Sequence, residues 1–431
     1  MDEALKARLA QTIAANFPAQ QAFLADLVRM PSLRGREAPC QDYLARAFAA
    51  RAWAVDRYTL DQIDPSHRRY APMVDTDPRD HVQVVATLRA PPPPPGRQMG
   101  RSLILQGHVD VVPEGPRALW TRAPYGAEVQ DGWMWGRGAH DMKAGVSAMV
   151  FALDALAACG LAPAGDVMVQ TVTEEEATGN GALSTLLRGY RADACLIPEP
   201  TGHAITRAHV GVLWFRLKLR GEPVHVAVAQ QGSNAILSAY VLIQALARLT
   251  ETLNEEAKAH PWFGSVPDPI KFNPGKIVGG DWASSTPAWC DVDCRIGLLP
   301  GTTPEAMAAR VREVVQATAR ADNFLANNPP EIVWNGFLAD GYVLEPGTAA
   351  ESVLAQAHAA VHGGTMPERA STALNDTRFY GNDFGIPALC YGPRGIGAHA
   401  FDERTDLASI QATTLVIALF IAAWCGVVAK S

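Results

Sequence analysis

Cysteine is scarce in the chain and never has the spacing of a cysteine-rich metal site. The seven cysteines are scattered, and none lies in a CxxC pair. This argues against both a disulfide framework and a four-cysteine metal site. We therefore expect a reducing, cytoplasmic environment.

The chain also lacks a basic excess and a recognisable export signal. Its formal net charge is −7, and it has no basic stripe of the kind that nucleic-acid-binding surfaces need. The first residues, MDEALKARLAQTIAANF, are amphipathic and partly acidic, whereas a signal peptide has a basic start and an apolar block. We expect no nucleic-acid partner and no export.

Long apolar runs are almost absent. Only residues 413–429, TTLVIALFIAAWCGVVA, look membrane-like, and a run of roughly 17 residues is at the short limit of a membrane span. We interpret this run as a buried terminal helix, with no membrane involved. Membrane attachment is the alternative.

The composition that remains is typical of a globular protein with two domains. Hydrophobic residues make up 48% and charged residues 19% of the 431 residues, which excludes a disordered chain and exceeds the length at which one core stops growing. The first half alternates short apolar strands with helical patterns, as in a sheet covered on both faces. These segments are SLILQGHVDVV (102–112), a helix near 142–156, VMVQTV (167–172) and ACLIP (194–198).

The pattern changes at LWFRLKLRG (213–221), where apolar and polar residues alternate as in a half-exposed strand. The segments that follow indicate a small antiparallel sheet with helices on one face. They are a helix at 234–250, the strand CDVDCRIG (290–297) and a helix at 304–319, before a helix at 348–361 resumes the α/β pattern.

We therefore predict the α/β fold class with an insertion. A catalytic domain with a mixed, mostly parallel sheet comprises residues 1–212 and 339–431. An inserted α+β lid or dimerisation domain comprises residues 213–338.

Candidate metal ligands lie where the apolar strands end. In GHVD, His108 and Asp110 are two residues apart on a strand and share a face, so the carboxylate could hold the imidazole as a metal-ligating histidine requires. In GRGAHDMKAG, glycines deliver Asp141 to a strand–helix junction. The alternatives are a structural His–Asp pair and a helix N-cap.

Further acidic residues follow. TEEEATGNG places Glu174, Glu175 and Glu176 directly after an apolar strand, where like charges repel unless a cation is present. Glu199 in IPEP and His399 in GIGAHAFDE lie at two more strand ends. Two divalent ions that share a bridging carboxylate would neutralise this set. Mixed histidine and carboxylate ligation suits zinc, with manganese or cobalt as alternatives.

Five blocks together, GHVDVVP, GRGAHDMKAG, TEEEATGNGAL, IPEPT and AHAFDE, resemble the M20 metallopeptidase family, the acetylornithine deacetylase and succinyl-diaminopimelate desuccinylase group. The resemblance covers nearly the whole chain. It implies that Asp141 bridges two metals and that Asp110 supports a ligand. The implied ligands are His108 and Glu199 for one metal, and Glu176 and His399 for the other.

The resemblance also implies a mechanism. Two metals lower the pKa of the water between them and polarise the scissile carbonyl, while Glu175 takes the proton of the water and returns it to the leaving amine. Glu175 and Glu176 can divide the roles of base and ligand because neighbours on an extended loop point in different directions.

The inserted segment resembles the lid of the same family. GEPVHVAVAQQGSNAI (221–236) resembles the stretch whose histidine reaches the substrate carbonyl, often across a dimer interface, which makes His225 the candidate oxyanion donor and implies a homodimer. Arg295 resembles a lid arginine that binds a substrate carboxylate. The alternatives are a half-buried strand histidine and an Arg295–Asp293 pair.

The expected function is hydrolysis of the amide bond of a small N-acylated amino acid or related amine. The segments HVAV (225–228) and NDTRF (375–379) depart from the common family pattern, which leaves the acyl group and the amine open. A formylaminopyrimidine deformylase or a dipeptidase is the alternative within the family. An inactive metal-binding scaffold is the alternative outside enzymes, although a scaffold has no need for Glu175.

Overall fold

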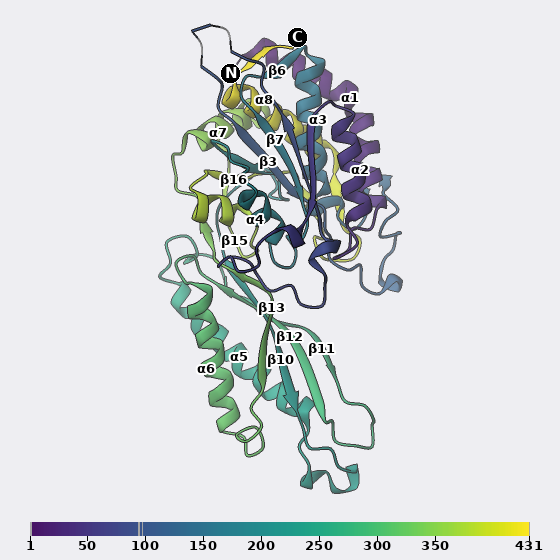
Figure 1. Cartoon of the computed structure of the whole chain (residues 1–431), viewed down its shortest axis with the longest axis vertical. Helices are drawn as coiled ribbons and strands as arrows, with labels where there is room; N and C mark the ends of the chain where they lie inside the picture. The colour runs from purple at the N-terminus through teal and green to yellow at the C-terminus, as the bar shows by residue number, and fades with distance from the viewer. Residues whose placement is uncertain (1, 94, 97, 431) are drawn as a thin grey trace.

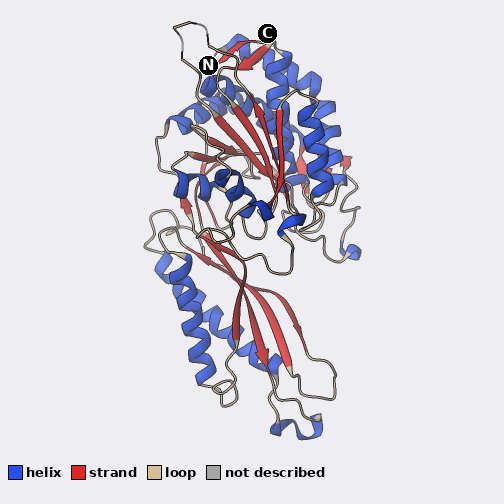
Figure 2. Ribbon diagram, viewed as in Figure 1, coloured by secondary structure: helices blue, strands red, loops and turns tan. Residues whose placement is uncertain are grey.

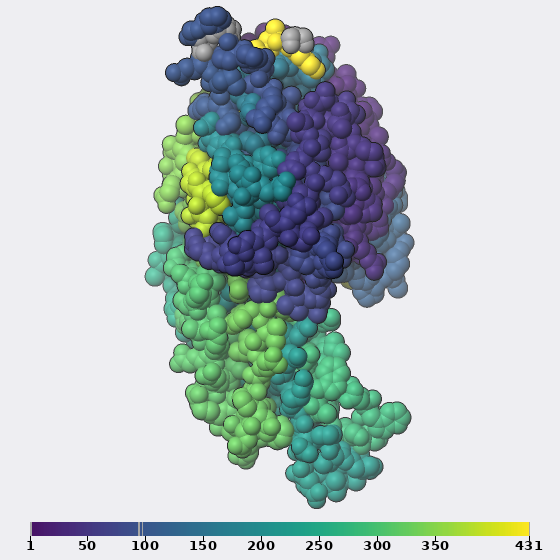
Figure 3. All heavy atoms as spheres, viewed as in Figure 1, coloured from purple at the N-terminus to yellow at the C-terminus, as the bar shows by residue number. Residues whose placement is uncertain are grey.

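The computed structural model describes residues 2–93, 95–96 and 98–430. It consists of a larger lobe that contains both termini and a smaller, elongated lobe that extends away from it (Figures 1 and 3). Helices surround the strands of the larger lobe, while two long helices lie beside the sheet of the smaller one (Figure 2).

The larger lobe is built on a six-stranded mixed sheet. Its order is β1-β2-β7-β3-β8-β16, in which β7, β3, β8 and β16 run parallel and the β1–β2 and β2–β7 pairs are antiparallel. The strands β3 and β7 are buried along their whole length, as expected for a sheet covered on both faces. The bounds are β1 (Ala54–Thr59), β2 (Val82–Leu88), β3 (Leu103–His108), β7 (Val167–Val172), β8 (Cys195–Ile197) and β16 (Ala388–Cys390).

Six helices pack around this sheet, among which α3 contacts α1 and α8, and α8 contacts α7. Several begin at side-chain caps: Asp2 accepts from two backbone N–H groups of α1, and Asp406 from two of α8. The bounds are α1 (Glu3–Arg29), α2 (Ala38–Ala49), α3 (Ala144–Ala158), α4 (Asn180–Leu187), α7 (Ala349–His362) and α8 (Leu407–Cys425).

The apolar run near the C-terminus is α8, followed by the short strand β19. Residues 416–421 of α8 are at most 1% exposed, and they belong to the main core of the larger lobe. In the described part of the chain two helices, α5 and α8, are long and apolar enough to cross a membrane. Burial in the core accounts for the composition of α8.

Three small sheets, which the sequence pattern does not predict, complete the larger lobe. The first contains β14 (Tyr342–Val343), β9 (Ile205–His209) and β15 (Glu368–Ser371). The second contains β17 (Gly395–Ile396), β18 (Arg404–Asp406), β5 (Trp133–Trp135) and β4 (Glu128–Gln130). The third pairs β19 (Val427–Ala429) with β6 (Leu161–Pro163). All seven cysteines are free and buried.

The smaller lobe is a four-stranded antiparallel sheet in the order β11-β12-β10-β13, with α5 and α6 packed together and against its strands. This confirms the expected α/β architecture with an inserted antiparallel unit. Its own apolar core contains residues of β10, β12, α5 and α6. The bounds are β10 (Gly211–Arg220), α5 (Ala235–Ala257), β11 (Phe272–Gly279), β12 (Trp289–Leu298), α6 (Pro304–Arg320) and β13 (Glu331–Ala339).

One side of this lobe exposes large apolar side chains, which we call the apolar edge. It comprises the first turns of α5, the edge strand β11 and the loop that follows it. An edge strand offers unpaired backbone groups to another strand. The exposed fractions are Ile236 38%, Leu237 63%, Tyr240 58%, Val241 45%, Ile277 54%, Val278 48% and Trp282 74%.

Candidate metal centre

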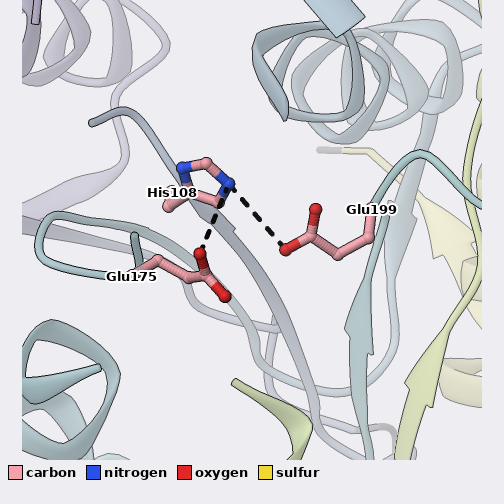
Figure 4. Close-up of side chains that lie close together, drawn as sticks. All are labelled: His108, Glu175 and Glu199. Carbon is pink, nitrogen blue, oxygen red and sulfur yellow. Dashed lines mark ion pairs between the residues drawn. The ribbon is translucent and has the colours of Figure 1, made fainter. Parts of the chain in front are cut away.

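His108 is the last residue of β3 and is 1% exposed. Its Nδ1 donates to the backbone carbonyl of Asp110 at 2.9 Å, which turns Nε2 toward three carboxylates. Asp141 Oδ1 lies 3.2 Å from Nε2, and oxygens of Glu175 and Glu199 each lie 3.9 Å from it (Figure 4). Glu175 follows β7 and Glu199 follows β8, while Asp141 comes from the segment η4 (Ala139–Lys143) directly before α3.

A second histidine approaches Asp141 from the opposite side. His399 Nε2 lies 3.0 Å from Glu176 and 3.6 Å from Asp141 Oδ2. The two carboxylate oxygens of Asp141 therefore face different histidines, Oδ1 toward His108 and Oδ2 toward His399. This is the arrangement that a bridging carboxylate needs.

The three successive glutamates separate in space. Glu174 is fully buried and forms a two-point ion pair with Arg34, at 2.5 and 2.9 Å, while the hydroxyl of Thr178 donates to it. Glu175 faces His108, and Glu176 faces His399. The prediction of an extended loop is wrong: residues 175–178 form a tight turn, and the N–H groups of Ala177, Thr178 and Gly179 donate to the carbonyl of Glu174. This turn, rather than extended geometry, points the neighbouring carboxylates apart.

Asp110 supports the site differently from the expected carboxylate–histidine hydrogen bond. Its backbone carbonyl is the closer partner of His108 Nδ1, and its carboxylate lies 3.6 Å away. Asp110 Oδ2 instead accepts from the backbone N–H of Glu176 at 3.1 Å. Asp110 thereby connects the loop of one histidine to the glutamate turn.

Glu403 is a residue that sequence reasoning missed. Its buried carboxylate accepts from the backbone N–H groups of Gly138, His140 and Asp141 at 2.9–3.1 Å, and from Arg137 at 2.6 Å. It therefore fixes the loop that carries Asp141. The only sequence signal is that Glu403 ends the block AHAFDE.

The electrostatics of the centre show an excess of buried negative charge. Burial raises the pKa of Glu175 and of Glu199 well above the usual value, although His108 opposes the rise, and neighbouring carboxylates add to it. Burial alone would lower the pKa of His108, but hydrogen bonds to Asp110 and Asp141 outweigh it and raise the pKa well above the usual value. The charge of Glu176 raises the pKa of His399 to about 9.

The donor set fits divalent metal ions. Ligand atoms of His108, Glu175 and Glu199 lie within 4.8 Å of one another, as do those of His108, Asp141 and Glu176. Buried like charges at such distances need a cation, and imidazole with carboxylate ligands is a combination that zinc accepts. Glu175 belongs to the first group, so distance alone does not separate base from ligand.

The two lid residues differ in position. Arg295 on β12 is half-buried, and its guanidinium donates to the carbonyls of Lys271 and Thr372. It does not pair with Asp293, which binds Arg216 instead at 2.6 Å. His225 is exposed, lies beside the short helix η5 (Val226–Gln231) and accepts from the N–H of Ala227. The η5 segment is at the far end of the smaller lobe from the central sheet (Figure 1).

Two cavities meet at the centre. The smaller, about 130 Å³, is lined by the metal-centre residues, by polar side chains that include Thr201, Thr206 and Asn375, and by apolar residues such as Leu374. The larger, about 680 Å³, extends between the lobes and includes Arg295, but His225 lines neither. The residues common to both are Glu175, Glu176, Ala373, Leu374 and His399.

Comparison with known proteins shows the family of the chain. The model of peptidase family M20/M25/M40 matches residues 104–423, which include every predicted ligand and both lid residues. The chain belongs to this family. Membership confirms the predicted resemblance and the predicted class, a metal-dependent hydrolase of amide bonds.

Two relatives illustrate the range of reactions in the family. An N-formyl-4-amino-5-aminomethyl-2-methylpyrimidine deformylase from Halalkalibacterium halodurans is 29% identical over 344 residues, which cover 75% of this chain and 79% of the relative. A succinyl-diaminopimelate desuccinylase from Rhodopseudomonas palustris is 28% identical over 408 residues, which cover 91% and 94%.

Solved structures share the fold. The dipeptidase Dug1p from Saccharomyces cerevisiae has a TM-score of 0.76 at 15% identity and covers 99% of both chains. Human carnosine dipeptidase 1 has a TM-score of 0.76 at 14% identity and covers 97% of this chain and 99% of that one. At these identities the likeness concerns architecture alone.

Proposed function

We propose that the protein removes the acyl group of a small N-acylated amino acid or related amine by hydrolysing its amide bond. The observation that carries this proposal is the position of Asp141 between two histidines, with Glu175 at the junction of the two cavities. Each cavity can receive one half of a substrate whose amide lies at that junction.

In this proposal two divalent metal ions, most simply Zn²⁺ with Co²⁺ or Mn²⁺ as alternatives, complete the centre. When bound, they supply an activated water and polarise the scissile carbonyl. Asp141 is the shared ligand. The other ligands are His108 and Glu199 for one ion, and Glu176 and His399 for the other.

Glu175 is the general base in this scheme. It is 7% exposed and lines both cavities, so it can take a proton from a water at their junction and deliver it to the leaving nitrogen. Arg34 holds Glu174 away from the junction, which leaves Glu175 as the member of the triplet that has no other fixed partner than His108.

The smaller lobe acts as lid and dimer interface in this proposal. His225 lines neither cavity of its own chain, so we assign it as an oxyanion donor to the partner subunit. The apolar edge carries the dimer contact, since exposed apolar side chains beside an unpaired edge strand suit a second copy of the same surface. Arg295, which has no carboxylate partner in the described structure, binds a carboxylate of the substrate.

Deformylation of an aminopyrimidine is a second candidate. The relative from Halalkalibacterium halodurans favours it, as does a second deformylase from Bacillus subtilis that is 27% identical over 343 residues. A formyl group, the smallest acyl group, suits the smaller cavity of about 130 Å³.

Two isosteric variants test the proposal. Glu175→Gln should keep its metals and bind substrate, yet lose about 10² to 10⁴-fold in turnover, the usual worth of general-base catalysis. Glu176→Gln should instead lose bound metal, measured by elemental analysis. If the two variants exchange these behaviours, the roles of base and ligand are reversed.

A panel of substrates tests the scaffold alternative. Metal-loaded wild-type protein should release amine from a panel of N-formyl, N-acetyl and N-succinyl amines and dipeptides. A protein that binds metal but cleaves no member of the panel would be a scaffold rather than an enzyme of this class.

A further inference from the structure

The larger cavity has an aromatic wall on the smaller lobe. Trp214 on β10 and Phe337 on β13 line it, with ring centroids 5.2 Å apart and planes at 87°. Phe337 is 5% exposed and Val212 is 1% exposed, and the partly buried Trp214 and Leu374 pack against them. The indole is therefore the half-exposed surface of a rigid apolar cluster.

The backbone is irregular at this wall. The pairing of β10 with β13 shifts register between Leu213 and Phe215, so Trp214 lies opposite an interrupted ladder. A Cβ on Gly336 would lie 2.6 Å from Trp214 Cε3. Glycine at this position thus allows the indole to pack directly on the β13 backbone. Bulges beside active sites commonly re-aim a side chain.

Charged groups near the wall, other than Lys276 and Arg295, are already paired. Arg216 binds Asp293 at 2.6 Å and Asp75 at 3.1 Å, and the amide of Asn335 donates to Asp293 at 3.0 Å. These pairs leave the indole as an apolar surface with no charge directed onto it. Arg295 is the guanidinium of this cavity that lacks an acidic partner within the described residues.

The cavities also differ in size and lining in a way that orients a substrate. The smaller cavity, where the hydroxyls of Thr201 and Thr206 lie beside apolar residues such as Leu374, has room for a short acyl group. The larger cavity has room for a ring and falls in the volume range of small-molecule sites. The amide lies at their junction, beside Glu175.

We propose that the amine half of the substrate carries a flat aromatic or heteroaromatic ring that stacks on Trp214, and that Trp214 determines this specificity. The inference rests on the proposed amide hydrolysis and adds the class of amine. Gly336 is a positioning residue, because it sets where the indole lies without touching the substrate.

The test compares N-acetyl-L-phenylalanine with N-acetyl-L-alanine as substrates of the metal-loaded enzyme. The wild type should prefer the aromatic substrate in kcat/KM. Trp214→Ala should reduce that preference by about 10-fold to 100-fold, the scale of one lost stacking contact, and Trp214→Phe should restore most of it. Gly336→Ala should reduce the preference although Trp214 is intact. Trp334→Phe, a change on β13 but outside the cavity, should leave the preference for the aromatic substrate unchanged.

The outcomes separate this inference from the proposed function. Cleavage of both substrates with a preference that Trp214→Ala leaves unchanged would overturn the inference and keep the hydrolase. If neither substrate is cleaved, equilibrium dialysis of N-acetyl-L-phenylalanine against wild type and Trp214→Ala decides: weaker binding by the variant supports the ring site, and equal binding overturns it. Metal content and circular dichroism, unchanged in each variant, exclude misfolding.

Discussion

The two lobes differ in which side chains they bury and which they expose. The larger lobe buries ionisable groups at one edge of its sheet, with His108 at 1% and Glu199 at 8% exposure. The smaller lobe has an apolar core as well, and its apolar edge gathers exposed apolar side chains, with Trp282 at 74%.

Both arrangements are costly for an isolated subunit, and each indicates what completes it. Buried carboxylates at close range need a cation. Exposed apolar side chains beside an edge strand need another protein surface. On this comparison rests our proposal that the larger lobe carries the metal chemistry and the smaller one the assembly.

Metal removal should reduce activity most, and it should act through the larger lobe alone. Chelation should abolish activity, and Zn²⁺, Mn²⁺ or Co²⁺ should restore it, because neither water nor carbonyl is activated without metal. His108→Ala and His399→Ala should each lower the metal content found by elemental analysis, whereas Leu237→Glu in the smaller lobe should not. Full activity of metal-free protein would contradict the assignment.

Loss of His225 should have the next largest effect, although it lies in the smaller lobe. His225→Ala should keep its metals and lose roughly 10² to 10³-fold in kcat, the scale of one oxyanion donor. Gln230→Ala, an exposed neighbour, serves as the control and should retain full activity.

Mixing two impaired variants tests whether His225 acts on the site of the partner subunit. After subunit exchange, His225→Ala and Glu175→Gln chains should recover activity, because one site of each mixed dimer receives both intact residues. Failure to recover activity despite demonstrated exchange would place His225 in the site of its own chain.

Disruption of the apolar edge should reduce activity by no more than His225→Ala does. Leu237→Glu combined with Tyr240→Glu should yield monomers in analytical ultracentrifugation, since two buried charges oppose the contact. Activity should fall because a monomer lacks the partner's donor, while metal content should stay constant. Thr252→Glu, also exposed on α5, is the matched control. A double variant that remains dimeric would show that the interface lies elsewhere.

The smallest effect concerns the support of the centre. Glu403→Gln should weaken metal affinity by about 10-fold to 100-fold, the usual worth of a group that orients a ligand, because the loop of Asp141 loses a charged acceptor. Competition with a chelator measures this affinity. Glu345→Gln, on the surface, should behave as wild type, and an unaltered affinity in Glu403→Gln would remove Glu403 from the metal centre.

The sequence predicts those parts of the fold that depend on local patterns. VMVQTV predicts β7 with both bounds, and the alternation after residue 213 predicts β10 to within two residues at its start. Candidate ligands follow in part from the same patterns, because His108 ends β3 and Glu199 follows β8 at one edge of the sheet. Asp141 instead lies in the segment η4 (Ala139–Lys143), directly before α3.

The remainder depends on contacts between distant segments. Nothing near Glu403 indicates that it accepts from the Asp141 loop more than 250 residues earlier. Arg34 pairs with the carboxylate of Glu174 at the start of the tight turn, and Gly336 leaves the space that Trp214 fills. Such roles are set by packing across the molecule, which hydrophobic periodicity does not encode.

The strand order has a consequence for synthesis on the ribosome. Strands β1, β2, β3, β7 and β8 are all made before the smaller lobe, whereas β16 and the loop of His399 emerge after it. Since β16 is the outermost strand beside β8, it can dock onto a nascent sheet without opening it. The emerging chain therefore holds four of the five predicted ligands before the smaller lobe is made, and His399 can join them only after that lobe.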